Sequence, residues 1–163
     1  MKTAPHASVT IRRERPDQPN VAALLGELDA YLDAMYPPEA NHILGVNALL
    51  APDVTFVVAR DADGIAVGTG ACRPGPAASG EPYGEIKRMF VAPAARGLRI
   101  GERVLATLED ALRNEGRPWA LLETGRDQIE ALRLYRRCGY AECPPFGGYP
   151  DNGLSVFLGK RLA

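Results

Sequence analysis

The segment at 96–101, Arg-Gly-Leu-Arg-Ile-Gly, contains residue types that can hold a phosphate group. It follows an apolar stretch and precedes a run with helical periodicity, so we expect a turn between a strand and the N-terminus of a helix. The first N–H groups of a helix have no partner within it, and the helix dipole adds about half a positive charge there. We predict that this turn binds a pyrophosphate, with Arg96 as an additional cation.

Two other kinds of phosphate-binding loop match this segment poorly. A Walker loop requires Gly-Lys followed by Ser or Thr, and that tripeptide does not occur in the sequence. A Rossmann loop belongs to a parallel βαβ unit near the N-terminus, whereas this turn is expected to follow an antiparallel meander. Both nucleotide interpretations are therefore disfavoured.

Two segments resemble the GNAT superfamily of acyl-CoA-dependent N-acyltransferases. The first, EIKRMFVAPAARGLRIGERVL, is similar to a strand followed by the phosphate motif Arg/Gln-x-x-Gly-x-Gly/Ala, with Arg96 and Gly101 matching. The second, QIEALRLYRRCGYAE, is similar to the helix motif Ala-x-x-x-Tyr-x-x-x-Gly-Phe/Tyr. The matched positions of that motif are Ala131, Tyr135, Gly139 and Tyr140.

Arg99 departs from the family pattern, because it stands where the first motif glycine belongs. A backbone N–H donates whatever side chain follows it, so the turn still binds phosphate if the Cβ atom of Arg99 points away from the ligand. We predict this outward orientation, with the guanidinium reaching the 3′-phosphate of the CoA ribose. If the side chain pointed inward, binding would weaken, and a non-catalytic module that binds acyl-CoA or a small ligand is the alternative function.

The resemblance implies acetyl-CoA as co-substrate. In the family, the fourth and fifth strands splay apart, and free backbone groups of the fourth strand hold the pantetheine arm. One N–H of that strand would also stabilise the oxyanion. The residues expected to contact the cofactor come from the strand, the turn and the start of the later helix, and they are Met89, Phe90, Val91, Arg96, Gly97, Leu98, Arg99, Ile100, Gly101 and Gln128.

Direct acetyl transfer to an amine requires a base for the amine and a proton for the leaving thiolate. The resemblance implies that Tyr135 is the general acid, and the alternative is an aromatic side chain that only packs. Two predicted strand ends supply candidates for the general base, Glu85 and Glu123, whose alternatives are solvated charges or a chain of waters. We expect no covalent enzyme intermediate, because no cysteine lies beside a histidine.

We expect the acceptor, a primary amine of a small molecule or a peptide, to bind between the segment after the first helix and the loop before the last strand. YPPEANH and FGGYPDN supply polar side chains there, and turn chemistry alone is the alternative. The candidates are Tyr36, Glu39, His42 and Tyr149. Lys87 and Arg88 leave open an acceptor that carries a carboxylate or a phosphate.

Composition limits the class of protein. A chain of 163 residues with 46% hydrophobic content predicts one domain over 1–163, and a net charge of −1 disfavours nucleic-acid and anionic-membrane partners. The three cysteines and two histidines do not have zinc-ligand spacing, so we expect no metal. With no apolar leader at its start and no apolar run long enough to span a membrane, the protein is expected to be cytoplasmic.

The apolar periodicities predict a mixed α/β domain with the order β-α-α-β-β-β-α-β-α-β-β. Strands are expected at 8–14, 54–60, 65–73, 83–91, 119–125 and 153–162, and helices at 17–36, about 42–50, 97–114 and 127–140. The resemblance implies a GNAT-like fold, with a central, mostly antiparallel sheet of about six to seven strands and four flanking helices. A homodimer is common among relatives, and the last strands could pair across one.

Overall fold

The computed structural model describes residues 8–75 and 80–162. Seven strands and four α-helices within these ranges confirm the predicted mixed α/β class and element order. The elements are β1 (Thr10–Arg13), α1 (Pro19–Met35), the 3-10 helix η2 (Pro38–Ala40), α2 (Val46–Leu49), β2 (Thr55–Arg60), β3 (Ala66–Pro74), β4 (Tyr83–Val91), the 3-10 helix η3 (Pro93–Ala95), α3 (Ile100–Asn114), β5 (Trp119–Gly125), α4 (Ile129–Arg137), β6 (Ala141–Glu142) and β7 (Ser155–Arg161).

The strands form one sheet in the order β1-β2-β3-β4-β5-β7-β6. All neighbouring pairs are antiparallel except β4 and β5, which are parallel. The two parallel strands pair only from Tyr83 to Glu85 on β4 and from Trp119 to Leu121 on β5. Beyond Glu85 the edge of β4 that faces β5 therefore has no strand partner, which is the splay that the family resemblance implies.

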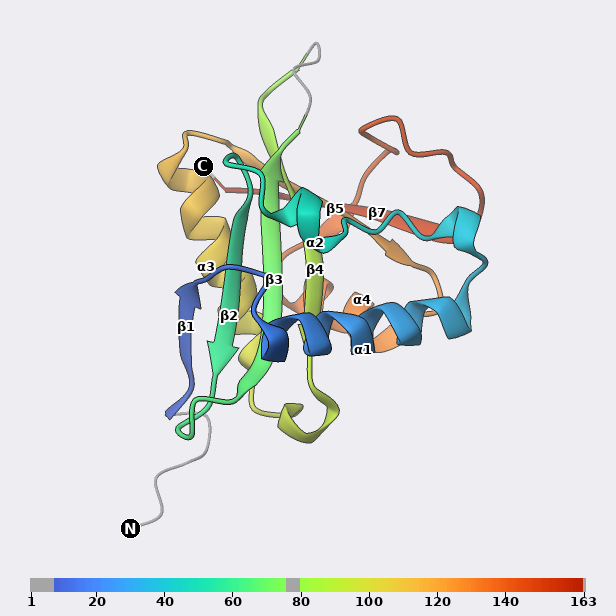
Figure 1. Ribbon diagram of the computed structural model, residues 1–163. Helices are drawn as coiled ribbons and strands as arrows, with labels where there is room; N and C mark the ends of the chain where they lie inside the picture. The colour runs from blue at the N-terminus through green and yellow to red at the C-terminus, as the bar shows by residue number, and fades with distance from the viewer. Residues whose placement is uncertain (1–7, 76–79, 163) are drawn as a thin grey trace.

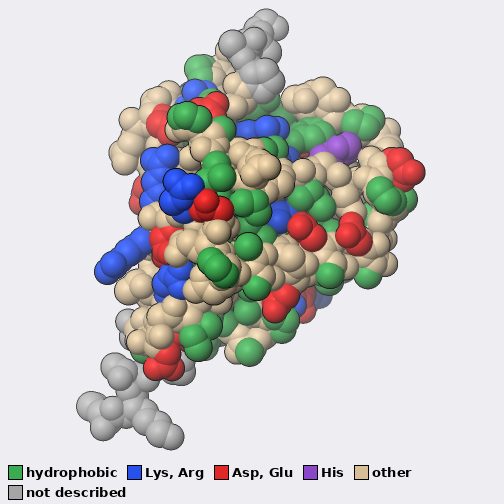
Figure 2. Space-filling model, in the orientation of Figure 1, with side chains coloured by type: hydrophobic (Ala, Val, Ile, Leu, Met, Phe, Trp, Pro, Cys, Tyr) green, Lys and Arg blue, Asp and Glu red, His purple; other side chains and the backbone are tan. Residues whose placement is uncertain are grey.

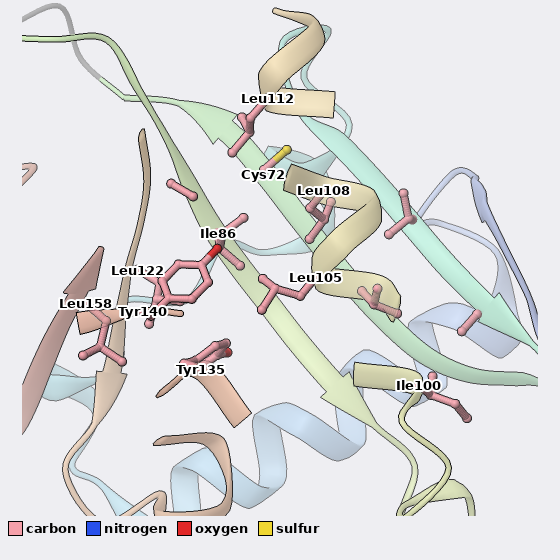
Figure 3. Close-up of a cluster of buried hydrophobic side chains, with 14 of the residues drawn as sticks. Cys72, Ile86, Ile100, Leu105, Leu108, Leu112, Leu122, Tyr135, Tyr140 and Leu158 are labelled. Atoms are coloured by element: carbon pink, nitrogen blue, oxygen red, sulfur yellow. The ribbon is translucent and has the colours of Figure 1, made fainter. Parts of the chain in front are cut away.

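Helices cover both faces of the sheet. On one face, α3 buries Val104, Leu105, Leu108 and Leu112 completely. Figure 3 shows these leucines against Ile86 of β4, with the α4 side chain of Tyr135 in the same cluster. The other face is covered by α1, which crosses in front of β3 and β4 in Figure 1. Apolar side chains three and four residues apart lie on one face of α3, and this face packs against the sheet.

Positive φ angles mark the start of α3 and the end of α4, two helices that are shorter than periodicity predicts. We expected α3 from residue 97, but it begins at Ile100 because Gly97 (φ +83°) and Arg99 (φ +60°) are left-handed. We expected α4 over 127–140, but it spans Ile129–Arg137, and Gly139 follows it at φ +96°. The strand β6 has only two residues, too few for a visible alternation.

Three properties of the described residues bear on the functional class. No helix among them is long and apolar enough to cross a membrane. No group of three or more His, Cys, Asp or Glu side chains in residues 8–75 and 80–162 is arranged to hold a metal ion. All three cysteines, Cys72, Cys138 and Cys143, are free thiols.

Candidate active site

The predicted phosphate turn joins η3 to α3. Arg99 is the N-cap residue of α3 with φ +60° and ψ +24°, and its side chain is exposed. A glycine at this position, as in the family motif, would adopt the left-handed conformation without strain and would also let the backbone approach a ligand closely. Arg99 keeps the same backbone path at a cost of about 1–2 kcal/mol, because its Cβ atom crowds the following carbonyl oxygen.

Replacing Arg99 with glycine is expected to raise the free energy of unfolding by about 1 kcal/mol, since glycine adopts this conformation without the steric cost. Urea denaturation followed by circular dichroism measures the change. Arg99→Ala is the matched control, because it removes the guanidinium but keeps the Cβ atom. A gain for alanine as large as that for glycine would contradict the conformational explanation.

A cleft of about 750 Å³ extends from this turn along β4 to the N-terminus of α4. All the residues predicted to contact the cofactor line this cleft except one. The exception is Leu98, which is half-buried and packs against the main hydrophobic cluster. Gln128 lines the cleft from its position as the N-cap residue of α4.

Arg96 is held at the rim of the cleft. Its Nε donates to the carbonyl oxygen of Val91 at 3.1 Å, and its guanidinium lies 5.7 Å from the centroid of the Phe90 ring. Its one acidic partner within the described chain is Glu130, which lies 3.8 Å away and is largely exposed. A weakly paired cation therefore lies beside the helix N-terminus, in the arrangement that an anionic ligand favours.

A bulge interrupts β4 next to the cleft. The β3–β4 register shifts between Thr69 and Ala71, and Arg88 takes a left-handed φ of +57°. The Thr69 hydroxyl donates to the Arg88 carbonyl at 2.9 Å and fixes this conformation. Because the bulge breaks the alternation of the strand, Arg88 reaches Asp29 on α1 while its neighbour Lys87 contacts the same side of the sheet.

A second, smaller cavity of about 110 Å³ lies on the α1 side of the sheet. Its polar lining includes Glu85, Lys87, Glu123 and His42. Figure 2 shows this face, where a histidine side chain lies near basic side chains over the sheet. The residues that line both this cavity and the cleft are Leu28, Met89, Gln128 and Tyr135. The two cavities therefore meet beside Tyr135.

Glu85 is buried, and its partners occupy both carboxylate oxygens. Arg73 donates to Oε1 at 3.1 Å, and the Tyr149 hydroxyl donates to Oε2 at 2.6 Å. Lys87 lies 3.7 Å from Oε2. Burial and the hydrogen bond to Glu85 raise the pKa of Tyr149, so that hydroxyl remains a donor at neutral pH.

Glu123 has a simpler environment at the end of β5. The Ser155 hydroxyl donates to its Oε1 at 2.6 Å, and this is its one hydrogen bond within the described chain. The carboxylate lines the smaller cavity. One oxygen of Glu123 is therefore available to a molecule in that cavity.

Tyr135 is buried on α4, with a ring centroid 5.9 Å from that of Tyr140. Burial raises the pKa of Tyr135, so its hydroxyl is protonated at neutral pH. The Tyr140 hydroxyl donates to Glu109 at 2.9 Å, and Lys160 also binds that carboxylate at 2.9 Å. This buried network fixes Tyr140, whose ring packs against that of Tyr135.

The predicted acceptor residues are only partly brought together. Tyr36 and His42 line the smaller cavity, and the Tyr36 hydroxyl accepts from the Asp127 N–H at 3.1 Å. The Tyr149 ring lies 4.9 Å from that of His42, so its loop closes over the same side. Glu39 is exposed on η2 and lines neither cavity.

The sequence patterns did not identify several polar residues of the site. Arg73 and Ser155 hold the two candidate bases, and Asp29 holds Arg88. Each contact depends on a strand register or a bulge that local sequence does not encode. The sequence marks Lys87 and Arg88 only as adjacent basic residues. The regular alternation of a strand would have placed their side chains on opposite faces of the sheet.

The family model described as Acetyltransferase (GNAT) family matches residues 18–140. The chain belongs to the GNAT family. It is 46% identical over 155 residues to the "IAA acetyltransferase" of Azospirillum brasilense, covering 95% of this chain and 99% of that protein. It is 31% identical over 144 residues to the uncharacterised N-acetyltransferase YsnE of Bacillus subtilis, covering 87% and 92% of the two chains.

Solved structures of GNAT-like proteins share the architecture. A Klebsiella pneumoniae protein described as an acyl-CoA N-acyltransferase superposes with a TM-score of 0.80 at 34% identity, covering 96% of this chain and 99% of that one. An aminoglycoside 6′-N-acetyltransferase complexed with coenzyme A superposes with a TM-score of 0.70 at 16% identity, covering 94% and 97%. Family membership and these relatives identify the protein as an acyltransferase enzyme.

Proposed function

We propose that this GNAT enzyme transfers an acetyl group from acetyl-CoA directly to the primary amine of a small molecule or peptide. The observation that carries the proposal is the junction of the two cavities beside Tyr135. A donor in the long cleft and an acceptor in the small cavity would bring thioester and amine together there. Holding two reactants in contact in this way removes much of the entropic barrier to reaction.

The long cleft suits coenzyme A. The N-terminus of α3 and Arg96 offer donors and positive charge for the pyrophosphate. Beyond Glu85, the edge of β4 facing β5 has no strand partner and can hydrogen-bond the amide groups of the pantetheine arm. The aminoglycoside 6′-N-acetyltransferase binds coenzyme A on the same fold, which supports this assignment.

The thioester carbonyl would lie at the junction of the cavities, next to Met89. The backbone N–H groups of Met89, Phe90 and Val91 follow the bulge, and one of them would donate to the carbonyl oxygen as it gains negative charge. Such fixed donors stabilise the tetrahedral intermediate at no reorganisation cost. The ion pair between Arg88 and Asp29 holds the bulge against α1 and so fixes those N–H groups.

Glu123 is better suited than Glu85 to be the general base. Each oxygen of Glu85 already accepts a hydrogen bond, from Arg73 or from Tyr149, whereas within the described chain one oxygen of Glu123 accepts from Ser155 and the other has no donor. A base must accept a proton from the amine directly or through one water, so it needs an open lone pair. We assign proton removal to Glu123 and a structural role to Glu85.

Tyr135 is the proposed general acid. The amine nitrogen bonds to the thioester carbon, the tetrahedral intermediate collapses, and the carbon–sulfur bond breaks. The Tyr135 hydroxyl gives its proton to the departing thiolate and recovers one from solvent or from the protonated Glu123. Burial raises the pKa of Tyr135, so its hydroxyl still holds its proton when the carbon–sulfur bond breaks.

Thiol release from acetyl-CoA across a panel of primary amines tests the function, with mass spectrometry of the products. We expect acetyl-CoA consumption that depends on an amine, together with a product heavier by one acetyl group. Binding of acetyl-CoA without turnover for any amine would favour the alternative of a non-catalytic acyl-CoA module. Hydrolysis of acetyl-CoA with no acetylated amine would contradict direct transfer.

Arg99 is expected to contribute to recognition of the CoA 3′-phosphate. Arg99 is exposed and lines the cleft, and a charge-assisted contact with phosphate contributes about 1.5–3 kcal/mol. Arg99→Gly should therefore weaken CoA binding about tenfold or more, and dephospho-CoA binding much less, when each is titrated by calorimetry. An equal loss for the two ligands, or tighter binding of CoA, would contradict this role.

A further inference from the structure

Two buried polar side-chain atoms in the described chain have no hydrogen-bond partner, and both belong to residues of the small cavity. They are Nε of Arg88 and Nε2 of His42. A buried donor without a partner costs about 1–3 kcal/mol, so native proteins rarely leave one without a reason. Two such atoms beside the same cavity indicate that a ligand group pairs with them.

Arg88 is an unusual residue to find with an unpaired nitrogen. Its side chain is 96% buried, and its two terminal nitrogens are used by Asp29 and by the carbonyl oxygen of Leu25. The left-handed bulge is what brings this cation to the α1 side of the sheet. The remaining Nε–H can pair only with an acceptor, and a guanidinium prefers an anionic one.

Lys87 adds a second buried cation beside Arg88. Its ammonium makes two hydrogen bonds in the described chain, to the His42 carbonyl at 3.1 Å and to the Tyr149 hydroxyl at 2.6 Å. Both partners act as acceptors, because Tyr149 gives its own proton to Glu85. A third N–H of Lys87 is left, with the Glu85 carboxylate 3.7 Å away and already occupied.

The cavity also carries negative charge. Glu123 lines it with one open carboxylate oxygen, and it lies near enough to Lys87 to act on that ammonium electrostatically. The other acidic groups of this region are paired: Glu85 with Arg73, and Asp29 with Arg88. The cavity therefore presents cationic donors together with one open carboxylate.

We propose that the acceptor is a small amino carboxylate, such as a free amino acid, whose carboxylate pairs with Lys87, Arg88 and His42 while its amine faces Glu123. This inference rests on the acetyl transfer proposed above and specifies its acceptor. The volume of about 110 Å³ suits a molecule of this size. Both unpaired nitrogens belong to side chains that line the cavity, so a carboxylate bound there would supply the partner that they lack.

The test compares each amino acid with its own amide, which keeps the amine and the side chain but lacks the negative charge. Glycine, L-alanine, L-serine, L-methionine and L-phenylalanine, the matching amides and ethylamine are assayed for thiol release with acetyl-CoA. We expect at least one acid to exceed its amide about tenfold or more in kcat/KM. The amide amine has the lower pKa and is the better nucleophile at neutral pH, so its reactivity cannot produce this preference.

Two variants of Lys87 test whether this residue causes the preference for acids over amides. In Lys87→Met, the acid-over-amide ratio should fall by about tenfold, whereas Lys87→Arg retains a cation and should keep most of the preference. A merely structural role for Lys87 would lower acid and amide turnover together and leave the ratio unchanged. Calorimetric titration of CoA-bound wild-type protein with the acid and the amide gives the same comparison without turnover.

The outcomes separate this inference from the function on which it rests. If amides and ethylamine are acetylated as efficiently as the acids, acetyl transfer stands and the carboxylate-binding site is overturned. An unchanged ratio in a folded Lys87→Met protein overturns it as well. If acetyl-CoA is not used with any amine in the panel, both the proposed function and this inference fail.

Discussion

Replacing Glu123 with glutamine is expected to lower kcat by about 10²- to 10⁴-fold, the usual contribution of a general base. The carboxamide has nearly the same shape and still accepts from the Ser155 hydroxyl, but it cannot take a proton from the amine. A base acts only when deprotonated, so wild-type activity should fall toward acidic pH. The variant should lose that acidic limb. Steady-state pH–rate profiles for both proteins measure the change.

Glu27→Gln is the matched control for Glu123, because Glu27 is an exposed residue of α1 that lines neither cavity. It should leave the profile unaltered. Glu85→Gln should instead destabilise the fold, since it weakens the contacts with Arg73 and Lys87. If Glu123→Gln keeps a full acidic limb, Glu123 is not the base. Loss of the limb only in Glu85→Gln would then assign the role to Glu85, and its retention in both variants would assign it to water.

Replacing Tyr135 with phenylalanine is expected to lower kcat by about 10²-fold or more, because the thiolate then leaves without its proton donor. The affinity for acetyl-CoA should change little, since the ring and its packing against Tyr140 are retained. Thiol-release kinetics and a calorimetric titration of acetyl-CoA measure the two quantities separately.

Tyr140→Phe provides the comparison for Tyr135, as both hydroxyls are on buried rings of the same cluster. This change removes the hydrogen bond to Glu109 and should lower the free energy of unfolding by about 1 kcal/mol. Its kcat should stay within a few-fold of wild type. If Tyr135→Phe retains wild-type kcat, Tyr135 serves only to pack the core.

Much of the fold was predictable because the elements with strong periodicity follow local rules. The bounds of β4 and β5 agree with the apolar patterns residue for residue. The helix α3 carries four wholly buried side chains at intervals of one, three and four residues, and this spacing identifies it from sequence. Its start at Ile100 was not predictable, because the apolar pattern does not indicate that Arg99 has a φ of +60°.

The donor cleft follows from sequence more readily than the acceptor cavity. Most of the cleft is built from two segments, residues 89–102 and 127–137, which short motifs describe well, and α1 adds Leu28 and Tyr31. The acceptor cavity combines α1, the 40–44 segment, β4, β5 and β7, and its polar contacts join residues up to 91 positions apart. The contact between Tyr149 and Glu85 depends on tertiary packing that no local pattern encodes.

The bulge in β4 is another feature that the local sequence does not predict. Residues 83–91 alternate well enough to predict a strand, but the alternation gives no sign that Arg88 is left-handed. A shift of one residue there turns two adjacent cations toward the same face. The charge pattern of the acceptor cavity thus depends on a backbone irregularity stabilised by Thr69 and Asp29.

The most direct test of the account is a calorimetric titration of the purified protein with acetyl-CoA, with ATP and NAD as controls. We expect micromolar binding of acetyl-CoA alone, on the order of −8 kcal/mol. That result would mean that the turn at 96–101 holds a pyrophosphate even with Arg99 in the position of the motif glycine. Absence of binding, or equal binding of ATP, would contradict the assignment of the cleft to acetyl-CoA.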